Sequence, residues 1–239
     1  PYTSGIKLVP YDDAKALEKA ITPNTVAFIF EPIQGEAGVY VPSKNYLKKV
    51  REICTKHNIM MIADEVQTGF CRTGKKFACD HEEVKPDAMA LGKALGGGVM
   101  PVSAVVADKK FMDVFTPGTH GSTFGGNPLA CAVGMAALDV LIDEKLDKKA
   151  ESLGKFFRKE IAKITCPKMK LVRGKGLLNA VVFEEGFQAW DVCVALKEKG
   201  LLAKQTHGNI IRFAPPLVIT KKQMIEAIAI IKEVFESIK

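Results

Sequence analysis

The sequence predicts an α/β fold in two parts, a mostly parallel sheet flanked by helices and a smaller C-terminal α/β unit. Two short apolar runs, at residues 26–30 and 59–63, both end at acidic residues, which is typical of buried parallel strands. An amphipathic helical pattern separates them, so the order strand, helix, strand predicts a βαβ unit. Beyond about residue 144 charged helices alternate with short strands. We therefore expect one unit over residues 1–144 and another over residues 145–239.

Local signals predict the other elements of the first unit. Ser43 is a suitable N-cap for the helix that runs to about His57 between the two strands. Short strands are predicted at residues 88–91 and 102–107, followed by a brief helix at 109–115. A long helix is expected after Asn127, because Pro128 suits the first helical turn. Its small residues at 130–137 permit close packing.

The second unit is predicted to be compact and to alternate helices with strands. Its predicted helices lie at residues 146–164, 188–199 and 221–238. Its predicted strands lie at residues 170–172, 178–183, 201–204 and 210–213. No internal repeat or low-complexity linker separates the units, so their boundary is expected within or beside a helix.

Composition limits the classes of protein to consider. A chain of 239 residues with 47% hydrophobic residues can bury a sizeable core, and no apolar run approaches the roughly 20 residues of a membrane-spanning helix. The net charge of +7 comes from lysines interleaved with Asp and Glu along helical stretches. These observations favour solvated helix faces over a nucleic-acid site, and we expect neither nucleic-acid nor membrane binding.

The cysteines occur singly, with no CxxC pair and no Cys/His spacing typical of a metal site. They are Cys54, Cys71, Cys79, Cys131, Cys166 and Cys193. Small buried thiols in a reducing compartment are the simplest interpretation, and no metal is expected.

Two predicted strands end in acids, at Glu31 and Asp64. In open α/β sheets ligands gather at the carboxyl ends of the strands, so both residues are candidate site residues by position. A helix cap or a loop anion explains them equally well at this point. Residues 64–69 read Asp-Glu-Val-Gln-Thr-Gly, and residues 91–98 read Leu-Gly-Lys-Ala-Leu-Gly-Gly-Gly.

These separated motifs, in this order, resemble the cofactor site of class III aminotransferases, which use pyridoxal 5′-phosphate (PLP). A lone lysine beside glycines is weak evidence, but the combination is specific. The resemblance implies the PLP-dependent transferase fold type I. Residues 1–144 would then form part of the large, mostly parallel-sheet α/β/α domain, and residues 145–239 the smaller C-terminal α/β domain.

The resemblance also implies roles for individual residues. Lys93 would be the Schiff-base lysine and the proton carrier, and Asp64 would pair with the protonated ring nitrogen. Gln67 would hydrogen-bond the phenolic oxygen of the ring. The glycine- and hydroxyl-rich stretch 118–128 is by itself an anion nest or a flexible loop. In the family its Ser-Thr pair, here Ser122 and Thr123, reaches the cofactor phosphate of the neighbouring subunit; Glu65 and His120 receive no chemical role.

Within class III the resemblance is to ornithine aminotransferases, and it covers essentially the whole chain. It is carried by residues 31–38, 173–180, 200–204 and 206–216. Arg212 would bind a substrate carboxylate, since a guanidinium offers two parallel donors to that group. Glu36 would pair with Arg212 and mask its charge for ornithine, then release it for a dicarboxylate. An ordinary structural ion pair remains the alternative.

The resemblance implies transfer of the δ-amino group of L-ornithine to 2-oxoglutarate, giving glutamate 5-semialdehyde and glutamate in proline biosynthesis. A homodimer with shared active sites is expected, in the cytoplasm or the mitochondrial matrix. An acetylornithine or 4-aminobutyrate aminotransferase, and a non-catalytic dimerisation module, are the alternatives. In the family the large domain begins well before the position of Pro1. That preceding part supplies a glycine loop, an aromatic ring stacked on the cofactor, and further substrate-binding residues, so we expect catalysis to depend on it.

Overall fold

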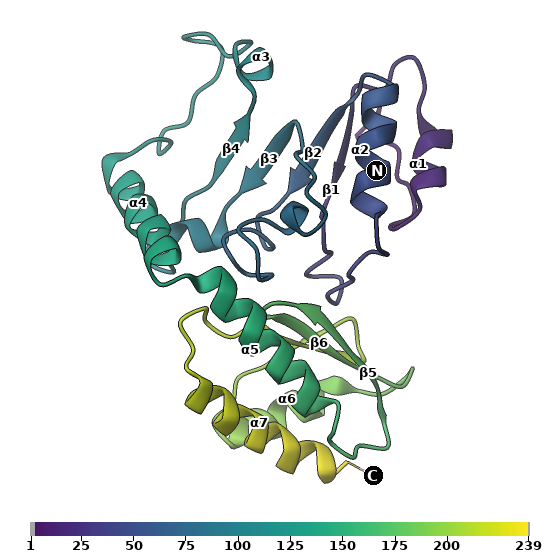
Figure 1. The fold of residues 1–239 in the computed structure, drawn as a ribbon, viewed down its shortest axis with the longest axis vertical. Helices are drawn as coiled ribbons and strands as arrows, with labels where there is room; N and C mark the ends of the chain where they lie inside the picture. The colour runs from purple at the N-terminus through teal and green to yellow at the C-terminus, as the bar shows by residue number, and fades with distance from the viewer. Residues whose placement is uncertain (1–2, 239) are drawn as a thin grey trace.

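The computed structural model describes residues 3–238 and confirms the α/β class, with a mixed sheet and an antiparallel sheet (Figure 1). The first sheet has the order β1-β2-β3-β4, with strands at Ala27–Phe30, Met60–Asp64, Ala88–Leu91 and Ala104–Ala107. The second has the order β5-β6-β8-β7, with β5 at Met169–Lys175, β6 at Leu178–Phe183, β8 at Ile210–Phe213 and β7 at Lys204–Thr206.

The first sheet brings the ends of its parallel strands to one edge. Strands β1, β2 and β3 are parallel, and β4 runs antiparallel to β3. The register places Asp64, the last residue of β2, beside Ala90 of β3, three residues before Lys93. The expectation that β1 is buried is wrong in part: β1 is an edge strand, and Ile29 is 66% exposed.

Helix α2 (Tyr46–Lys56) packs on this sheet through a buried side formed by Tyr46, Leu47, Val50 and Cys54. The predicted Ser43 cap is wrong, because Asn45 is the N-cap and Ser43 instead donates a hydrogen bond to Asp12 (2.8 Å). The carboxylate of Glu82 accepts from the amides of Asn45 (2.7 Å) and Lys48 (3.2 Å). A distant acid therefore satisfies the helix N-terminus.

Four other elements of the first unit are short. Helix α1 (Ala14–Ala20), which the apolar pattern did not predict, begins where Asp13 accepts from the amide of Ala16 (2.8 Å) and lies beside α2 (Figure 1). Helix α3 spans only Lys109–Met112. Two 3₁₀ turns, Ala78–His81 and Lys93–Gly96, follow β2 and β3 respectively.

Helix α4 (Pro128–Asp143) begins as predicted, with the Asn127 side chain accepting from the amide of Ala130 (2.9 Å). The buried Gly134 allows α4 to approach the backbone of Leu95 in the turn after Lys93. Helix α5 (Leu146–Ile161) follows after a break at Glu144 and at Lys145, whose φ is +50°. This break supports the division into residues 1–144 and 145–239, which stays a prediction.

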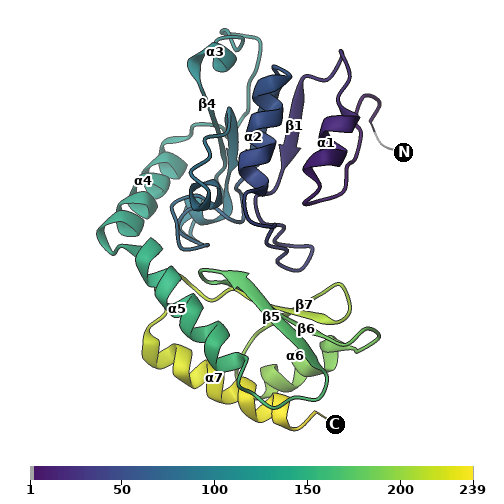
Figure 2. The same cartoon turned by 45° about the vertical axis from the view of Figure 1, so that its right-hand side comes forward.

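The second sheet lies between the first unit and helices α6 (Ala189–Glu198) and α7 (Lys221–Glu236), as Figure 2 shows. Strand β7 shares only Lys204 with the predicted strand at residues 201–204. It starts at Lys204, because pairing with β8 places Lys204 directly opposite Arg212. Leu202 is left in an exposed loop.

A hydrophobic cluster joins the two units, in addition to the core within each unit. Its buried residues come from the first unit (Ile33, Val39 and Ala78) and from the second (Leu178, Ala180, Val182 and Ile210). Within residues 3–238, none of the helices combines the length and the apolar character needed to cross a lipid bilayer. All six cysteines lie in the described part as free thiols, five of them buried and Cys131 exposed.

Candidate functional site

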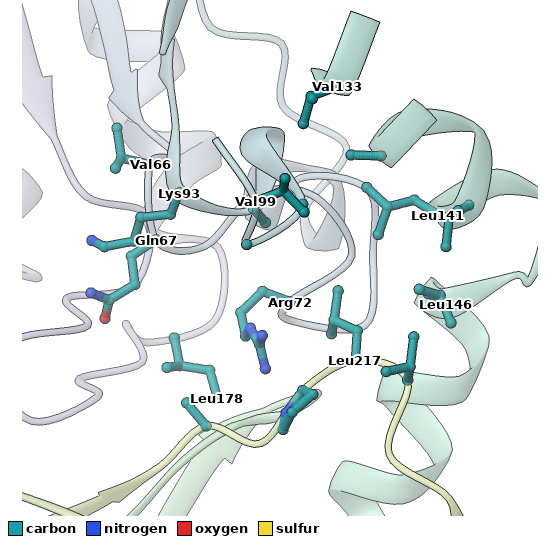
Figure 3. Close-up of a pocket in the computed structure, with 18 of the residues that line it drawn as sticks. Val66, Gln67, Arg72, Lys93, Val99, Val133, Leu141, Leu146, Leu178 and Leu217 are labelled. Carbon is teal, nitrogen blue, oxygen red and sulfur yellow. The ribbon is translucent and has the colours of Figure 1, made fainter. Parts of the chain in front are cut away.

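A cavity of about 690 Å³ opens beside the carboxyl edge of the first sheet, where the two units meet (Figure 3). Gln67, Arg72, Lys93 and Arg212 supply its polar side chains. Its apolar wall comes from α4, the start of α5 and the 214–218 segment, through residues such as Val133, Leu141, Leu146 and Leu217. This volume and this mixture of a few polar groups with an apolar lining are typical of cofactor and small-molecule sites.

Lys93 enters the cavity from the first position of the 3₁₀ turn that follows β3. Its φ is +45°, a left-handed conformation that is unfavourable for a residue with a side chain. Such conformations persist where the surrounding structure enforces them, and they occur often at functional sites. The lysine side chain is exposed to the cavity rather than held in an ion pair at the surface.

Asp64 ends β2, and Gln67 lies in the turn that follows. Asp64 accepts a hydrogen bond from the amide of Val66 (3.0 Å) and lies at the same sheet edge as Lys93, but it is not among the residues that line the cavity. Gln67 does line it, and its Oε1 accepts from Nη1 of Arg212 (3.2 Å). The structure therefore brings Gln67, Lys93 and Arg212 together at the cavity, while Asp64, three residues before Gln67, lies at the adjoining sheet edge.

Glu65 is a buried residue that stabilises this turn through hydrogen bonds. Its side chain is fully buried and accepts hydrogen bonds from the amides of Ala78 (3.0 Å) and Cys79 (2.9 Å) and from the hydroxyl of Thr68. Burial raises the pKa of this carboxyl group, while the hydrogen bonds oppose the shift. Its role is structural, since it points away from the cavity into the core.

Glu36 forms an ion pair with Arg212, as the resemblance implied. Oε2 of Glu36 lies 2.7 Å from Nη1 of Arg212, and Oε1 lies 2.6 Å from Nζ of Lys204. The hydrogen bond from Lys204, then that from Arg212, lowers the pKa of Glu36 to about 2. The carboxylate is therefore ionised at any ordinary pH.

A hairpin carries Glu36 across from the first unit to the second. Its strands meet at the bridge between Gln34 and Tyr40. The guanidinium of Arg173 stacks on the Tyr40 ring (3.8 Å to the centroid) and donates to the carbonyl of Gly38 (2.7 and 3.0 Å). The hydroxyl of Thr206 donates to the carbonyl of Glu36 (2.5 Å). These contacts fix the hairpin tip beside Arg212.

Arg72 is a cavity residue that the sequence did not single out. Its guanidinium donates to the carbonyls of Pro215 (2.6 Å) and Leu177 (3.2 Å), and burial, with a smaller effect of the nearby Arg212, lowers its pKa to about 10. It thus ties the turn after Asp64 to the second unit. The only signal in the sequence was an arginine within the glycine-rich stretch after Gln67, which is not specific.

The other candidates lie outside the cavity. Ser122 and Thr123 are exposed in the loop before α4, and the Ser122 hydroxyl accepts from the amide of Gly125 (3.1 Å). Their expected partner is a second subunit, so their role stays a prediction. Glu31 accepts from the amide of Gly35 (3.0 Å), which agrees with the simpler reading of a loop anion.

The chain is similar in sequence to known aminotransferases. The family model for class III aminotransferases matches residues 6–235. The mitochondrial ornithine aminotransferase of Drosophila melanogaster is 57% identical over 234 residues, which is 98% of this chain and 54% of the relative. The chain thus spans about half the length of this relative.

Solved structures agree with this match. The ornithine aminotransferase of Toxoplasma gondii superposes with a TM-score of 0.96 at 51% identity, over 98% of this chain and 57% of that one. The acetylornithine aminotransferase of Elizabethkingia anophelis superposes with a TM-score of 0.91 at 57% identity, over 95% of this chain and 61% of that one. With the motifs, the cavity and these matches in agreement, the chain belongs to the class III aminotransferases.

Proposed function

We propose that the protein is a PLP-dependent aminotransferase that transfers the δ-amino group of L-ornithine to 2-oxoglutarate. The observation that carries the proposal is the Glu36–Arg212 ion pair, which adjoins Gln67 at the cavity that contains Lys93. An enzyme that accepts a diamino acid and then a dicarboxylate needs a cation that can be masked and exposed in turn. The ornithine aminotransferases among the relatives support the choice of substrate.

The residues of the site fit PLP chemically. Lys93 offers a primary amine for the aldehyde, Asp64 an anion for the ring nitrogen, and Gln67 an amide for the phenolic oxygen. The cavity of about 690 Å³ is large enough for the cofactor together with a small substrate. When bound, PLP supplies the electron sink that stabilises negative charge at the substrate carbon.

Each of these residues has a defined task in the proposed reaction. Lys93 Nζ carries the proton to and from the substrate carbon that bears the amino group. Asp64, as an anion, keeps the ring nitrogen protonated. Gln67, whose Oε1 accepts a hydrogen bond from Arg212, would help to orient the ring by hydrogen-bonding its phenolic oxygen. The family resemblance is the basis for these roles.

Arg212 and Glu36 would select the substrate of each half-reaction. For ornithine, the carboxylate of Glu36 covers Arg212 and removes its attraction for an anion. For 2-oxoglutarate, Glu36 moves aside, so that Arg212 binds a carboxylate with two parallel hydrogen bonds. Because the pKa of Glu36 is about 2, this release occurs by movement of an ionised side chain and not by protonation.

Acetylornithine is the second candidate substrate, because an acetylornithine aminotransferase is 57% identical to this chain. We expect kcat/KM for L-ornithine to exceed that for N-acetylornithine or 4-aminobutyrate by at least about tenfold, equivalent to about 1.4 kcal/mol. Turnover of the three donors with 2-oxoglutarate, measured on the PLP-loaded enzyme, tests the proposal. Preference for acetylornithine would move the assignment to the second candidate, and no turnover of any donor would favour a non-catalytic dimerisation module.

We further propose a homodimer with shared active sites, in which Ser122 and Thr123 bind the cofactor phosphate of the partner. Exposed apolar side chains surround this loop and continue along α4, and they support a covered interface. They are Val114, Phe115, Phe124, Leu129, Met135 and Ile142. The proposed product, glutamate 5-semialdehyde, would enter proline biosynthesis. The compartment proposed is the cytoplasm, with the mitochondrial matrix as the alternative, given the mitochondrial Drosophila relative.

Gly35→Ala tests the contact between Gln67 and Arg212. A Cβ at position 35 would lie 1.8 Å from Oε1 of Gln67, so the flexible end of Gln67 must leave its place beside Arg212. We expect kcat/KM to fall about tenfold, in the range for a misplaced positioning group, with little change in stability. Steady-state kinetics and thermal denaturation measure both quantities. Unchanged kinetics would show that the position of Gln67 does not matter.

A further inference from the structure

Lys204 and Arg212 stand directly opposite each other on the neighbouring strands β7 and β8. Like charges in such a cross-strand pair repel and destabilise a sheet. Here the carboxylate of Glu36 lies between them. One of its oxygens is 2.6 Å from Nζ of Lys204 and the other is 2.7 Å from Nη1 of Arg212. Glu36 is therefore shared between two cations, although the proposed exchange of substrates needs only one of them.

The net charge of the cluster formed by Glu36, Lys204, Arg212 and any bound substrate carboxylate depends on which substrate is bound. With Glu36 on both cations, the cluster holds two positive charges and one negative charge. When a substrate carboxylate reaches Arg212, the cluster becomes neutral, with two cations and two anions. Without Lys204 the same state would contain one cation and two anions, and Glu36 would repel the incoming carboxylate.

The exposure of the side chains shows which partner Glu36 can keep. Arg212 is only 15% exposed and faces the cavity, whereas Lys204 is 56% and Glu36 59% exposed. The backbone of Glu36 is also fixed on the side of β7, because its carbonyl accepts from Thr206. A side chain leaving Arg212 therefore has Lys204 within reach, at the solvent edge of the site.

We propose that Lys204 is a specificity-determining positioning residue. It keeps its ion pair with the Glu36 carboxylate when Arg212 exchanges Glu36 for a carboxylate of a dicarboxylate substrate. This inference rests on the proposed function. Lys204 does not touch the substrate in this scheme. It lowers the free energy needed to separate Glu36 from Arg212, so it favours the 2-oxoglutarate half-reaction and has little influence on the ornithine half-reaction.

Lys204→Met in the PLP-loaded enzyme tests the proposal, because methionine keeps much of the aliphatic stem and removes the charge. We expect KM for 2-oxoglutarate and the dissociation constant of glutarate, an unreactive dicarboxylate, to rise about three- to fivefold, as for a partly exposed ion pair. Single-turnover kinetics with ornithine should change by less than about twofold. Lys204→Arg should restore both dicarboxylate constants, since it restores the charge.

Two controls test whether the effect of Lys204→Met on dicarboxylate binding is specific to the site and passes through Glu36. Lys199 forms a similar surface pair with Glu233 (2.6 Å), away from the site, and Lys199→Met should match the wild type. In a Glu36→Gln background, Lys204→Met should no longer alter glutarate binding, because its effect passes through Glu36. An equal effect in that background would mean that Lys204 attracts the substrate directly, and this result would overturn the proposal.

The experiments distinguish a failure of the proposed function from a failure of the role proposed for Lys204. If the wild type does not exchange amino groups between ornithine and 2-oxoglutarate, the function itself is wrong. If the wild type does so and Lys204→Met binds glutarate as the wild type does, only the role of Lys204 is wrong. An equal loss in both half-reactions would indicate a structural lysine and would also overturn the proposal.

Discussion

Lys93→Ala is expected to reduce transamination by about a thousandfold or more, the combined effect of losing a covalent anchor and a general base. Lys93 supplies the one lysine amine that lines the cavity within the described residues. The variant should also lack the visible absorbance band of a lysine-bound cofactor. Borohydride reduction of the wild type, followed by peptide mass analysis, should place the cofactor on Lys93.

The fold of this variant should be intact, because the Lys93 side chain is exposed to the cavity and alanine keeps the same backbone restriction at a φ of +45°. Lys85→Ala is a matched control, since Lys85 is an exposed lysine paired with Asp108 (3.0 Å) outside the cavity. It should retain the band and the activity. A visible band in Lys93→Ala, or a trapped cofactor on another lysine, would contradict the assignment.

Gly154→Ala is expected to lower the free energy of unfolding by roughly 3 kcal/mol, as severe overpacking does. Gly154 lies inside α5, where alanine would normally stabilise a helix by about 1 kcal/mol. Here an added Cβ would lie 1.7 Å from the carbonyl oxygen of Gly176. The steric clash should therefore make the substitution destabilising, although helix propensity alone predicts that it stabilises the protein.

Gly176 cannot move away to relieve this conflict. On its other side a Cβ would meet backbone atoms of Thr73 and Gly74 at 2.3 and 2.5 Å, and its carbonyl accepts from Arg158 (3.0 Å) and Asn179 (3.2 Å). Three backbone segments thus meet without side chains between them. A shift of Gly176 would also disturb the two hydrogen bonds.

Gly134→Ala is the matched control, because Gly134 is also buried inside a helix. Its added Cβ would meet Leu95 at 3.6 Å, an ordinary contact, so we expect no loss of stability and a gain of up to about 1 kcal/mol. Chemical denaturation of both variants measures the difference. Equal stabilisation by both substitutions would show that α5 moves away from the turn at Gly176.

The sequence by itself determined the class of fold and the order of most elements, and the family resemblance of its motifs indicated the candidate site residues. Strand runs that end in polar residues are local signals, and parallel strands place their carboxyl ends at one edge. The position of Asp64 at this edge followed from its strand, whereas Gln67 and Lys93 were assigned only through the family resemblance. The start of α4 was also predictable from local signals, since Asn127 and Pro128 act within a single turn.

Only the tertiary structure decided the features that depend on distant partners. Glu82 caps α2 in place of Ser43, the pairing with β8 sets the start of β7, and Arg72 enters the cavity by binding the carbonyl of Pro215. Lys204 and Glu36 are 168 residues apart, and a hairpin from one unit brings them together on the sheet of the other. The periodicity of a segment indicates which face of a helix or strand is apolar. It does not indicate which residue, distant in the sequence, will pair with the polar and charged groups of that element.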